Sequence, residues 1–510
     1  MSADVIARGL ALGRTRGTLP IDSGAPWYFA ATGLDANQSA SLYTPSASQQ
    51  FGASADVFWS PDYPTIGWRF YFCNWMLRGS TTLTQELDGN AAIILQGAVL
   101  VVNGVRYPLT FAGQAGITLN PGDGVWSDPI GDALLIPPRT KGSVITCWQA
   151  QTSASAMMGS FFPNAGLGEG FVLGSTTQAA YLTSGTVPYT APASLYAYGP
   201  TAAVAQGGDG REVVLLVGDS IATGTGEANF ASDARNNRGW TARWLDSTAN
   251  GAQRIPHAKL CVPSGACRQN TLASHFTRRA AMMVALPNLP FTRIVNQMGL
   301  NDATGSATTW RDRITVHAGL MKALWNVPLL QLGFTPYTTA DTSRFTTAAG
   351  QSYFANHDWP SGFTQQAQAL LAALPTNIDR FLFIGDVFDG RQSLGAAAEG
   401  KWRSDFSAIN TTLSAATLAN ATSIVVRGPV ALGTALAINA GNATAEVVTV
   451  TAVSGVGAVT CTVFPALVNA HSAGETVRGV AVQDGLHPST EMAAWAAERL
   501  APRKAEVLVR

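Results

Sequence analysis

Short, wholly apolar runs alternate with helix-length amphipathic segments between about residues 210 and 385. The run at 213–217 is apolar at every position, which predicts a strand covered on both faces, as in a parallel sheet. Because strands that alternate with helices imply right-handed crossovers, the pattern predicts an α/β domain with a parallel sheet of about five strands. Further strands are expected at 259–262, 294–298, 329–334 and 380–384, and helices at 240–246, 272–286, 310–325 and 363–374.

From about residue 26 to 195 the apolar positions fall instead into short alternating runs separated by turn signals. Residues 98–102, Asn103-Gly104 and 105–107 predict a hairpin with a tight turn, and 120–124 is a second strong turn signal. This spacing is typical of a β-sandwich or jelly roll. The region's aromatic residues could form a sugar-stacking platform, but the interpretation as core is favoured; they are Trp59, Trp68, Phe70, Phe72, Trp75, Trp126 and Trp148.

The pattern changes twice more along the chain. Small residues, Pro and Gly at 180–210 indicate a linker or a strand-poor seam. A helix is expected at 401–413, followed by β-rich runs at 423–427, 446–450 and 459–463, and the chain closes with a helix at 490–500 capped by Ser489 or Thr490. The predicted organisation is an N-terminal segment (1–25), a β-sandwich (26–200), an α/β domain (210–414 and 481–510) and a small β module (415–480) inserted in it.

Composition narrows the classes of function. The chain has 510 residues, with Lys plus Arg and Asp plus Glu both 32, and it has no long basic run, so no nucleic-acid partner is expected. No apolar run is long enough to span a bilayer, and residues 1–17 show no signal-peptide core, which leaves an extracellular or virion-associated location open. Cys261 and Cys267 could pair across a loop or remain reduced.

Candidate chemistry lies at the end of the first strand and near the chain's end. Gly218-Asp219-Ser220 follows the apolar run directly, where side chains of a parallel sheet face a crevice. A serine nucleophile needs a base and a group that orients that base. His487 could be the base, and Asp484, three residues earlier, could orient it. The alternatives without a chemical role are an ordinary Gly-Asp turn for the first motif and a helix cap for the Asp-x-x-His motif. The other histidines show no zinc-ligand spacing, and no cofactor is expected.

Four short blocks together resemble the SGNH, or GDSL, hydrolase family. They are Gly218-Asp219-Ser220, Ser264-Gly265, Gly299-Leu300-Asn301-Asp302 and Asp484-Gly485-Leu486-His487-Pro488, in the family's order. The resemblance implies a flavodoxin-like three-layer domain, with Ser220 as nucleophile, His487 as base and Asp484 as its orienting group. It also implies an oxyanion hole made by the backbone N–H groups of Ser220 and Gly265 and the amide of Asn301.

The likeness extends to residues 108–130, which are similar to the β accessory region of SGNH esterases that act on acylated carbohydrates. The resemblance therefore implies an esterase that forms an acyl-enzyme at Ser220 and releases a small acyl group, such as acetate. Two alternatives stay open. One is a glycan-binding structural protein of a phage tail or cell surface with a vestigial hydrolase domain, because residues 415–480 and the N-terminus are diffusely similar to phage proteins. The other is a lipid esterase.

Overall fold

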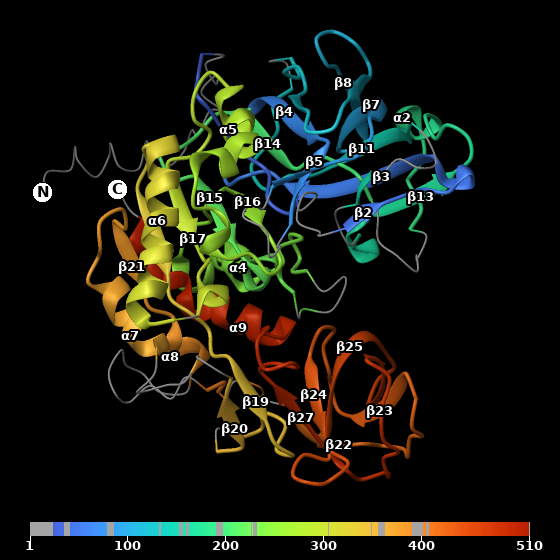
Figure 1. The fold of residues 1–510 in the computed structure, drawn as a ribbon. Helices are drawn as coiled ribbons and strands as arrows, with labels where there is room; N and C mark the ends of the chain where they lie inside the picture. Colours follow the sequence, from blue (N-terminus) through green and yellow to red (C-terminus); the bar gives the residue numbers. More distant parts are fainter. Residues whose placement is uncertain are drawn as a thin grey trace, which may run out of the picture.

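A parallel sheet of five strands forms the centre of the α/β region in this computed structural model (Figure 1). All four of its strand pairs are parallel, which confirms the predicted α/β class. The order β16-β15-β17-β18-β21 places the first strand between the second and the third, as in flavodoxin-like sheets. The strands are β15 (Val214–Gly218), β16 (His257–Cys261), β17 (Arg293–Asn296), β18 (Leu329–Leu332) and β21 (Arg380–Leu382).

The residues that the structure describes are 24–34, 41–78, 86–131, 134–151, 157–159, 163–189, 197–225, 227, 232–303, 305–347, 349–354, 357, 363–389, 401–403, 407 and 409–508. The predicted segment 1–25 lies almost entirely outside the described residues.

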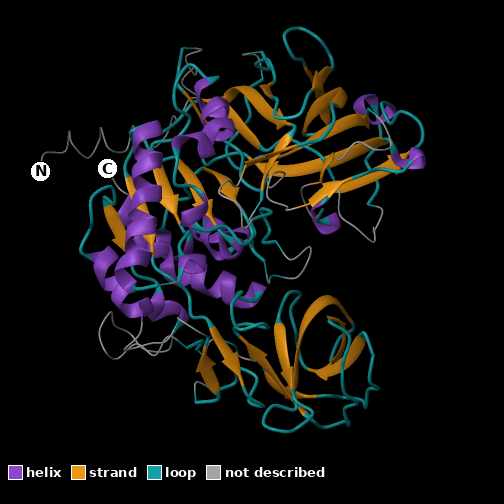
Figure 2. Cartoon of the chain, viewed as in Figure 1, coloured by secondary structure: helices purple, strands orange, loops and turns teal. Residues whose placement is uncertain are grey.

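Helices cover the parallel sheet and pack on one another in pairs, α4 with α9 and α6 with α7 (Figure 2). Ser489 caps α9, because its side chain accepts a hydrogen bond from the Met492 amide at 3.2 Å, as predicted. The helices are α3 (Ser220–Thr223), α4 (Trp240–Asp246), α5 (Thr277–Val284), α6 (Ala307–Trp325), α7 (Phe363–Ala372), α8 (Gly385–Phe388), α9 (Thr490–Leu500) and α10 (Lys504–Leu508). None of the described helices is long and apolar enough to cross a membrane.

Two antiparallel sheets form the N-terminal sandwich. One has the order β1-β14-β4-β10 and the other β13-β3-β11-β7-β8, with β9 beside β7. Their strands are β1 (Trp27–Phe29), β3 (Phe51–Trp59), β4 (Ile66–Cys73), β7 (Ile93–Val102), β8 (Val105–Leu109), β9 (Ile117–Leu119), β10 (Gly124–Trp126), β11 (Lys141–Ala150), β13 (Gly170–Gly174) and β14 (Ala202–Gln206). Two small pairs, β2 (Ser41–Tyr43) with β12 (Met157–Gly159) and β5 (Trp75–Leu77) with β6 (Glu86–Asp88), and the short helix α2 (Ala180–Thr183) complete the region.

The sandwich confirms two predictions and corrects a third. The Asn103-Gly104 turn joins β7 to β8, with both residues at positive φ as a tight hairpin requires. The aromatic residues considered for a sugar-stacking platform are all buried except the partly exposed Trp59, so the interpretation as core is confirmed. The prediction of a strand-poor seam at 180–210 is wrong at β14, which is fully buried between β1 and β4.

The inserted β module is a six-stranded antiparallel sheet, in the order β22-β27-β24-β25-β26-β23. Its strands are β22 (Asn410–Thr412), β23 (Ser423–Arg427), β24 (Ala435–Ile438), β25 (Glu446–Ser454), β26 (Ala458–Phe464) and β27 (Thr476–Val480). The helix predicted at 401–413 is wrong at its C-terminal end, because β22 pairs there with β27. The sheet has its own apolar core, which includes Leu413, Ile424 and Val450.

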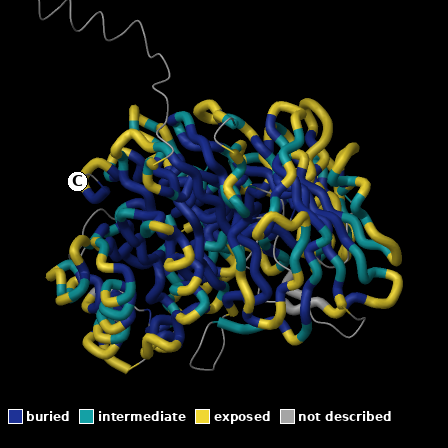
Figure 3. The backbone as a smooth tube through the Cα atoms, turned by 90° about the horizontal axis from the view of Figure 1, so that it is seen from above, coloured by how far each residue is buried: buried dark blue, intermediate teal, exposed yellow. Residues whose placement is uncertain are grey.

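A short hairpin connects this module to the α/β region. It consists of β19 (Thr338–Ala340) and β20 (Gln351–Tyr353), and it projects beside the module at the bottom of Figure 1. Its tip contacts the module, because the Gly441 amide donates to the Thr342 carbonyl at 2.7 Å and Arg344 Nε donates to the Ala445 carbonyl at 2.9 Å. Seen from above, buried segments fill the centres of both the sandwich and the α/β region (Figure 3). Cys261 and Cys267 are both buried and form no disulfide with each other.

Candidate active site

Ser220 lies where the chain turns from β15 into α3. The turn is tight: a Cβ at Gly218 would overlap the side chain of Ala222, so only glycine lets α3 fold back so closely. Asp219 caps α3, since its Oδ1 accepts a hydrogen bond from the Ile221 amide at 3.0 Å. Ser220 is therefore the first residue of the helix, and its own N–H has no acceptor in a preceding helical turn.

Asp484 and His487 lie together in the turn that leads from the module into α9. The Oδ1 atom of Asp484 accepts hydrogen bonds from the backbone amides of Leu486 at 2.9 Å and His487 at 2.8 Å, which fixes the carboxylate against the turn. Gly485 has a φ of +84°, and a Cβ there would overlap the Thr338 carbonyl oxygen. Because the Thr338 amide also donates to the Gly485 carbonyl at 2.9 Å, β19 supports this turn directly.

Hydrogen bonds join these three side chains across the sheet edge. His487 Nε2 lies 2.8 Å from Ser220 Oγ, and His487 Nδ1 lies 2.6 Å from Asp484 Oδ2. Burial opposes ionisation of Asp484, but the hydrogen bonds and charge of His487 outweigh it and lower the pKa of that carboxyl below its usual value. An ionised Asp484 fixes the proton of His487 on Nδ1, so Nε2 faces Ser220 as an acceptor.

Gly265 and Asn301 also lie at the carboxyl ends of strands next to β15. The Val262 amide donates to the Gly218 carbonyl at 2.9 Å and the Gln297 amide to the Val217 carbonyl at 2.8 Å, so the loops after β16 and β17 flank the Ser220 turn. Asn301 Nδ2 donates to the Gly265 carbonyl at 2.9 Å. The Gly265 N–H itself donates to the Val262 carbonyl at 3.0 Å, so a bound oxyanion would have to share this donor.

Asp302 belongs to the motif Gly299-Leu300-Asn301-Asp302, but the motif did not predict what its side chain does. Its carboxylate is buried and accepts hydrogen bonds from the backbone amides of Cys267 at 2.6 Å and Arg268 at 3.0 Å. Arg268 in turn donates to the Asn301 carbonyl. Asp302 therefore fastens the loop of Gly265 to the loop of Asn301, and its position directly after Asn301 was the only sequence signal for this role.

Asp219 is fully buried beside the triad. Its Oδ2 has no hydrogen-bond partner among the described residues. Burial raises the pKa of Asp219 to about 7, although the hydrogen bond from the Ile221 amide and the charge of His487 both favour the ionised form. The folded protein thus holds a neutral carboxyl next to Ser220 over much of the acidic range.

The raised pKa of Asp219 predicts that the free energy of unfolding depends on pH. Below about pH 3.8 Asp219 is protonated in both the folded and the unfolded chain. Between about pH 3.8 and 7 the unfolded chain has ionised this carboxyl but the folded protein has not, so the free energy of unfolding falls as pH rises. We expect Asp219→Asn to remove a fall of roughly 3–4 kcal/mol in unfolding free energy over this interval, as measured by urea unfolding. Asp312→Asn, at an exposed position, is the matched control. Equal pH slopes for the unmodified protein and Asp219→Asn would contradict the assignment.

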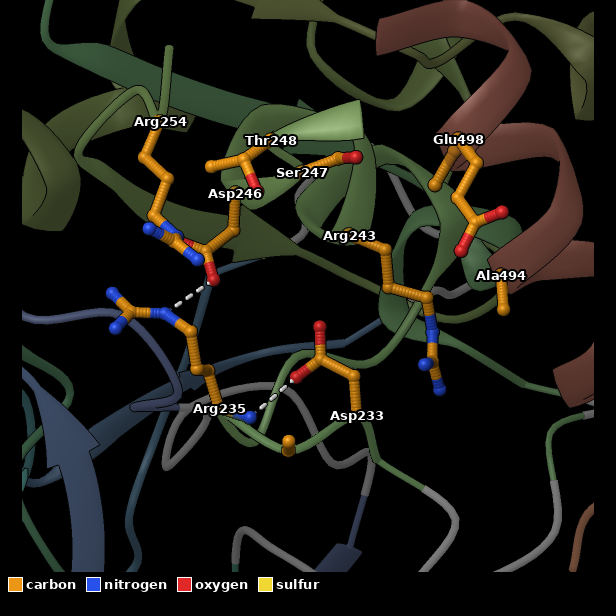
Figure 4. A pocket seen from close by; sticks show the side chains of 11 residues that line it. Asp233, Arg235, Arg243, Asp246, Ser247, Thr248, Arg254, Ala494 and Glu498 are labelled. Carbon is orange, nitrogen blue, oxygen red and sulfur yellow. Dashed lines mark hydrogen bonds and ion pairs between the residues drawn. The ribbon is translucent and has the colours of Figure 1, made fainter. Parts of the chain in front are cut away.

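Two cavities lie away from the triad. One of about 240 Å³ is lined by residues of α4, α9 and the loops before and after α4, and some of its charged side chains form ion pairs (Figure 4). Arg235 Nε, for example, lies 2.6 Å from Asp246 Oδ2. The other, of about 660 Å³, lies at the opposite end of β15, around Arg211 and Lys504. Within the described residues, no group of three or more His, Cys, Asp or Glu side chains is arranged to hold a metal ion.

Comparisons with known proteins give distant likenesses of structure only. No family model matches the chain, and no curated protein does. A family two carbohydrate esterase from Cellvibrio japonicus matches at 9% identity and a TM-score of 0.23, covering 70% of this chain and 88% of the esterase. The salicylyl-acyltransferase SsfX3 from a tetracycline biosynthetic pathway matches at 10% identity and a TM-score of 0.22, covering 69% and 82%. TM-scores this low add nothing to the geometric argument.

Proposed function

We propose that this protein is a serine esterase of the SGNH type, which releases small acyl groups, acetyl foremost, from carbohydrate hydroxyls. The observation that carries the proposal is the hydrogen-bonded chain from Ser220 through His487 to Asp484. It lies at the point where the strand order of the sheet reverses, which is where doubly wound sheets bind their ligands.

In the proposed acylation step, His487 Nε2 takes the proton of Ser220 while Oγ attacks the carbonyl carbon of the ester. The carbonyl oxygen gains the negative charge and is stabilised by the N–H groups of Ser220 and Gly265 and the amide of Asn301. When the tetrahedral intermediate collapses, the bond to the alcohol oxygen breaks and His487 returns its proton to that oxygen. Asp484 stays ionised throughout, which agrees with its lowered pKa.

Deacylation repeats this sequence with water as the nucleophile. His487 takes a proton from the water, hydroxide adds to the acyl carbon, and the acid leaves as Ser220 Oγ recovers its proton from His487. The same imidazole therefore accepts and returns a proton in both steps.

The choice of substrate rests on the resemblance of residues 108–130 to the accessory region of carbohydrate esterases, and on the partial exposure of the site. Asp484 keeps 52% of its side-chain surface exposed, whereas only 14% of the His487 side chain is exposed. A site that is open on the Asp484 side suits an ester attached to a bulky polar alcohol better than a long acyl chain that needs a closed apolar groove.

A panel of esters tests this choice. We expect kcat/KM to be highest for acetyl esters and to fall by about tenfold or more as the acyl chain of an aryl ester lengthens from two to eight carbons, because the proposed substrate carries a small acyl group. Acetylated polysaccharides should release acetate, measured as free acid.

Two outcomes would overturn the proposal. Higher kcat/KM for long chains would favour the lipid esterase, and glycan binding without turnover of any ester would favour the glycan-binding structural protein.

A further inference from the structure

A stacked pair of aromatic side chains lies beside the triad, outside the residues assigned to catalysis. The rings of Tyr337 and Phe354 are nearly parallel, at 10°, with their centroids 4.2 Å apart. Tyr337 directly precedes β19 and Phe354 directly follows β20, so the two rings lie side by side at the base of the hairpin. The Phe354 amide also donates to the Tyr337 carbonyl at 3.1 Å, which fixes the two backbones together.

This pair lies on the Asp484 side of the site. The next residue after Tyr337, Thr338, is hydrogen-bonded to Gly485 within the catalytic turn. Burial and the nearby charge of Asp484 both raise the pKa of Tyr337, which places its hydroxyl within reach of that charge. The stacked pair therefore borders the turn that holds Asp484 and His487.

Buried aromatic side chains hold the pair rigidly from behind. The ring of His357 packs against Tyr337 at 4.8 Å and edge-on against Trp310 at 5.7 Å. Burial lowers the pKa of His357 to about 4, so this support is uncharged at neutral pH. Trp310 stacks on Phe334 and donates from Nε1 to the Gly299 carbonyl at 2.6 Å, so the same indole supports the loop that carries Asn301.

The front of the pair is open to solvent and has polar neighbours. Phe354 is 42% exposed, which is unusual for a phenylalanine whose ring contacts those of Tyr337 and His357. Thr339 and Ser352 beside it are exposed, and so is the carboxylate of Asp484. A flat apolar face with hydroxyl and carboxylate groups at its edges matches a pyranose ring, which has an apolar C–H face and hydroxyl groups around its rim. An acyl chain would instead require a continuous apolar groove.

We propose that Tyr337 and Phe354 form the binding platform for the sugar ring that carries the ester. His487 must protonate the leaving alcohol, so the alcohol part of the substrate lies on the His487 and Asp484 side, where the pair is. The inference rests on the proposed esterase function and adds to it the residues that select the alcohol. Because the rings are already fixed, binding costs little side-chain entropy.

The test compares two polyol acetates that differ in the ring. The probes are a methyl glucopyranoside that carries one acetyl ester, and monoacetylglycerol, which has hydroxyl groups but no ring. We expect Phe354→Ala to lower the ratio of kcat/KM for the pyranoside to that for monoacetylglycerol by about tenfold. Tyr337→Phe, which keeps the ring, should retain the ratio of the unmodified protein. A ratio that does not change in Phe354→Ala would overturn the platform.

Tyr353→Ala is the matched control. Tyr353 is the last residue of β20 and directly precedes Phe354, so in extended backbone its side chain points to the opposite face. Its ring centroid lies 5.5 Å from Lys401 Nζ. A similar fall in this variant would show that damage to the hairpin, rather than loss of the platform, changes the ratio, and would also overturn the inference.

Failure of the esterase itself gives a different result. If neither acetate is hydrolysed, the proposed function fails, and titration of the methyl glucopyranoside against the unmodified protein and Phe354→Ala still tests the platform. Binding that weakens in Phe354→Ala supports it, and equal or absent binding overturns it.

Discussion

Replacing Ser220 with alanine is expected to lower kcat for aryl acetate hydrolysis by about 10⁴-fold or more. The variant lacks the hydroxyl oxygen that lies 2.8 Å from His487 Nε2, so no acyl-enzyme can form at this position. The fold should survive, because the change removes one buried hydroxyl oxygen and leaves no void larger than that atom. Steady-state kinetics and thermal unfolding measure the two effects separately.

Covalent labelling sharpens this test. Ser220 Oγ should attack the phosphorus of a fluorophosphonate and give up its proton to His487, and fluoride should leave to solvent as the P–F bond breaks. The phosphonyl group then stays bonded to the peptide that contains Ser220, which mass spectrometry would detect. Ser454→Ala, at an exposed position of the β module, is the control for the substitution itself. Retained hydrolysis by Ser220→Ala, or labelling at another serine, would refute the assignment of the nucleophile.

Replacing Asp484 with asparagine should lower kcat by about 10³-fold or more, because it reverses the tautomer of His487. Asparagine can still accept the two amide hydrogen bonds that Oδ1 accepts from Leu486 and His487, so the turn is preserved. Its NH₂ group would then face His487 Nδ1 and make that nitrogen an acceptor. Nε2 would carry the proton and could no longer take one from Ser220.

The ring nitrogens of His487 report this change directly. In the unmodified protein Nδ1 should show the ¹⁵N chemical shift of a protonated nitrogen, and in Asp484→Asn this shift should belong to Nε2 instead. A purely structural role of Asp484 would not cause this change. Asp312→Asn on α6 provides an exposed control for the same change of charge. Unaltered shifts together with unaltered kcat would show that Asp484 does not orient the base.

The α/β region could be predicted from the sequence because each strand of a parallel sheet is buried on both faces. Runs such as 213–217 then have no polar positions, and this pattern is hard to mistake. β14 was missed because Ala202–Gln206 is made mostly of alanine, which has low strand propensity, and only its pairing with β1 and β4 makes it a strand. The predicted helix at 401–413 failed for the same reason, since the pairing of β22 with β27 outweighs local preference.

Some features of the candidate site could also be predicted from the sequence, and others could not. Asp484 and His487 are three residues apart, so their contact could be predicted from local spacing, and the place of Ser220 followed from its position after a strand. The aromatic platform could not be predicted, because Tyr337 and Phe354 come together only through the hairpin between them. The Gly265 hydrogen bond to Val262 also depends on a turn that no motif specifies.

The hydrogen bond between Ser220 and His487 joins positions 267 residues apart, with four strands of the parallel sheet and the whole inserted module between them. During synthesis, the nucleophile therefore leaves the ribosome long before its base does. Domains fold from the N-terminus as the chain emerges, and contacts of such long range form late. Ser220 therefore lacks its histidine until the segment with Asp484, His487 and α9 has docked, and the proposed esterase would be inactive until then.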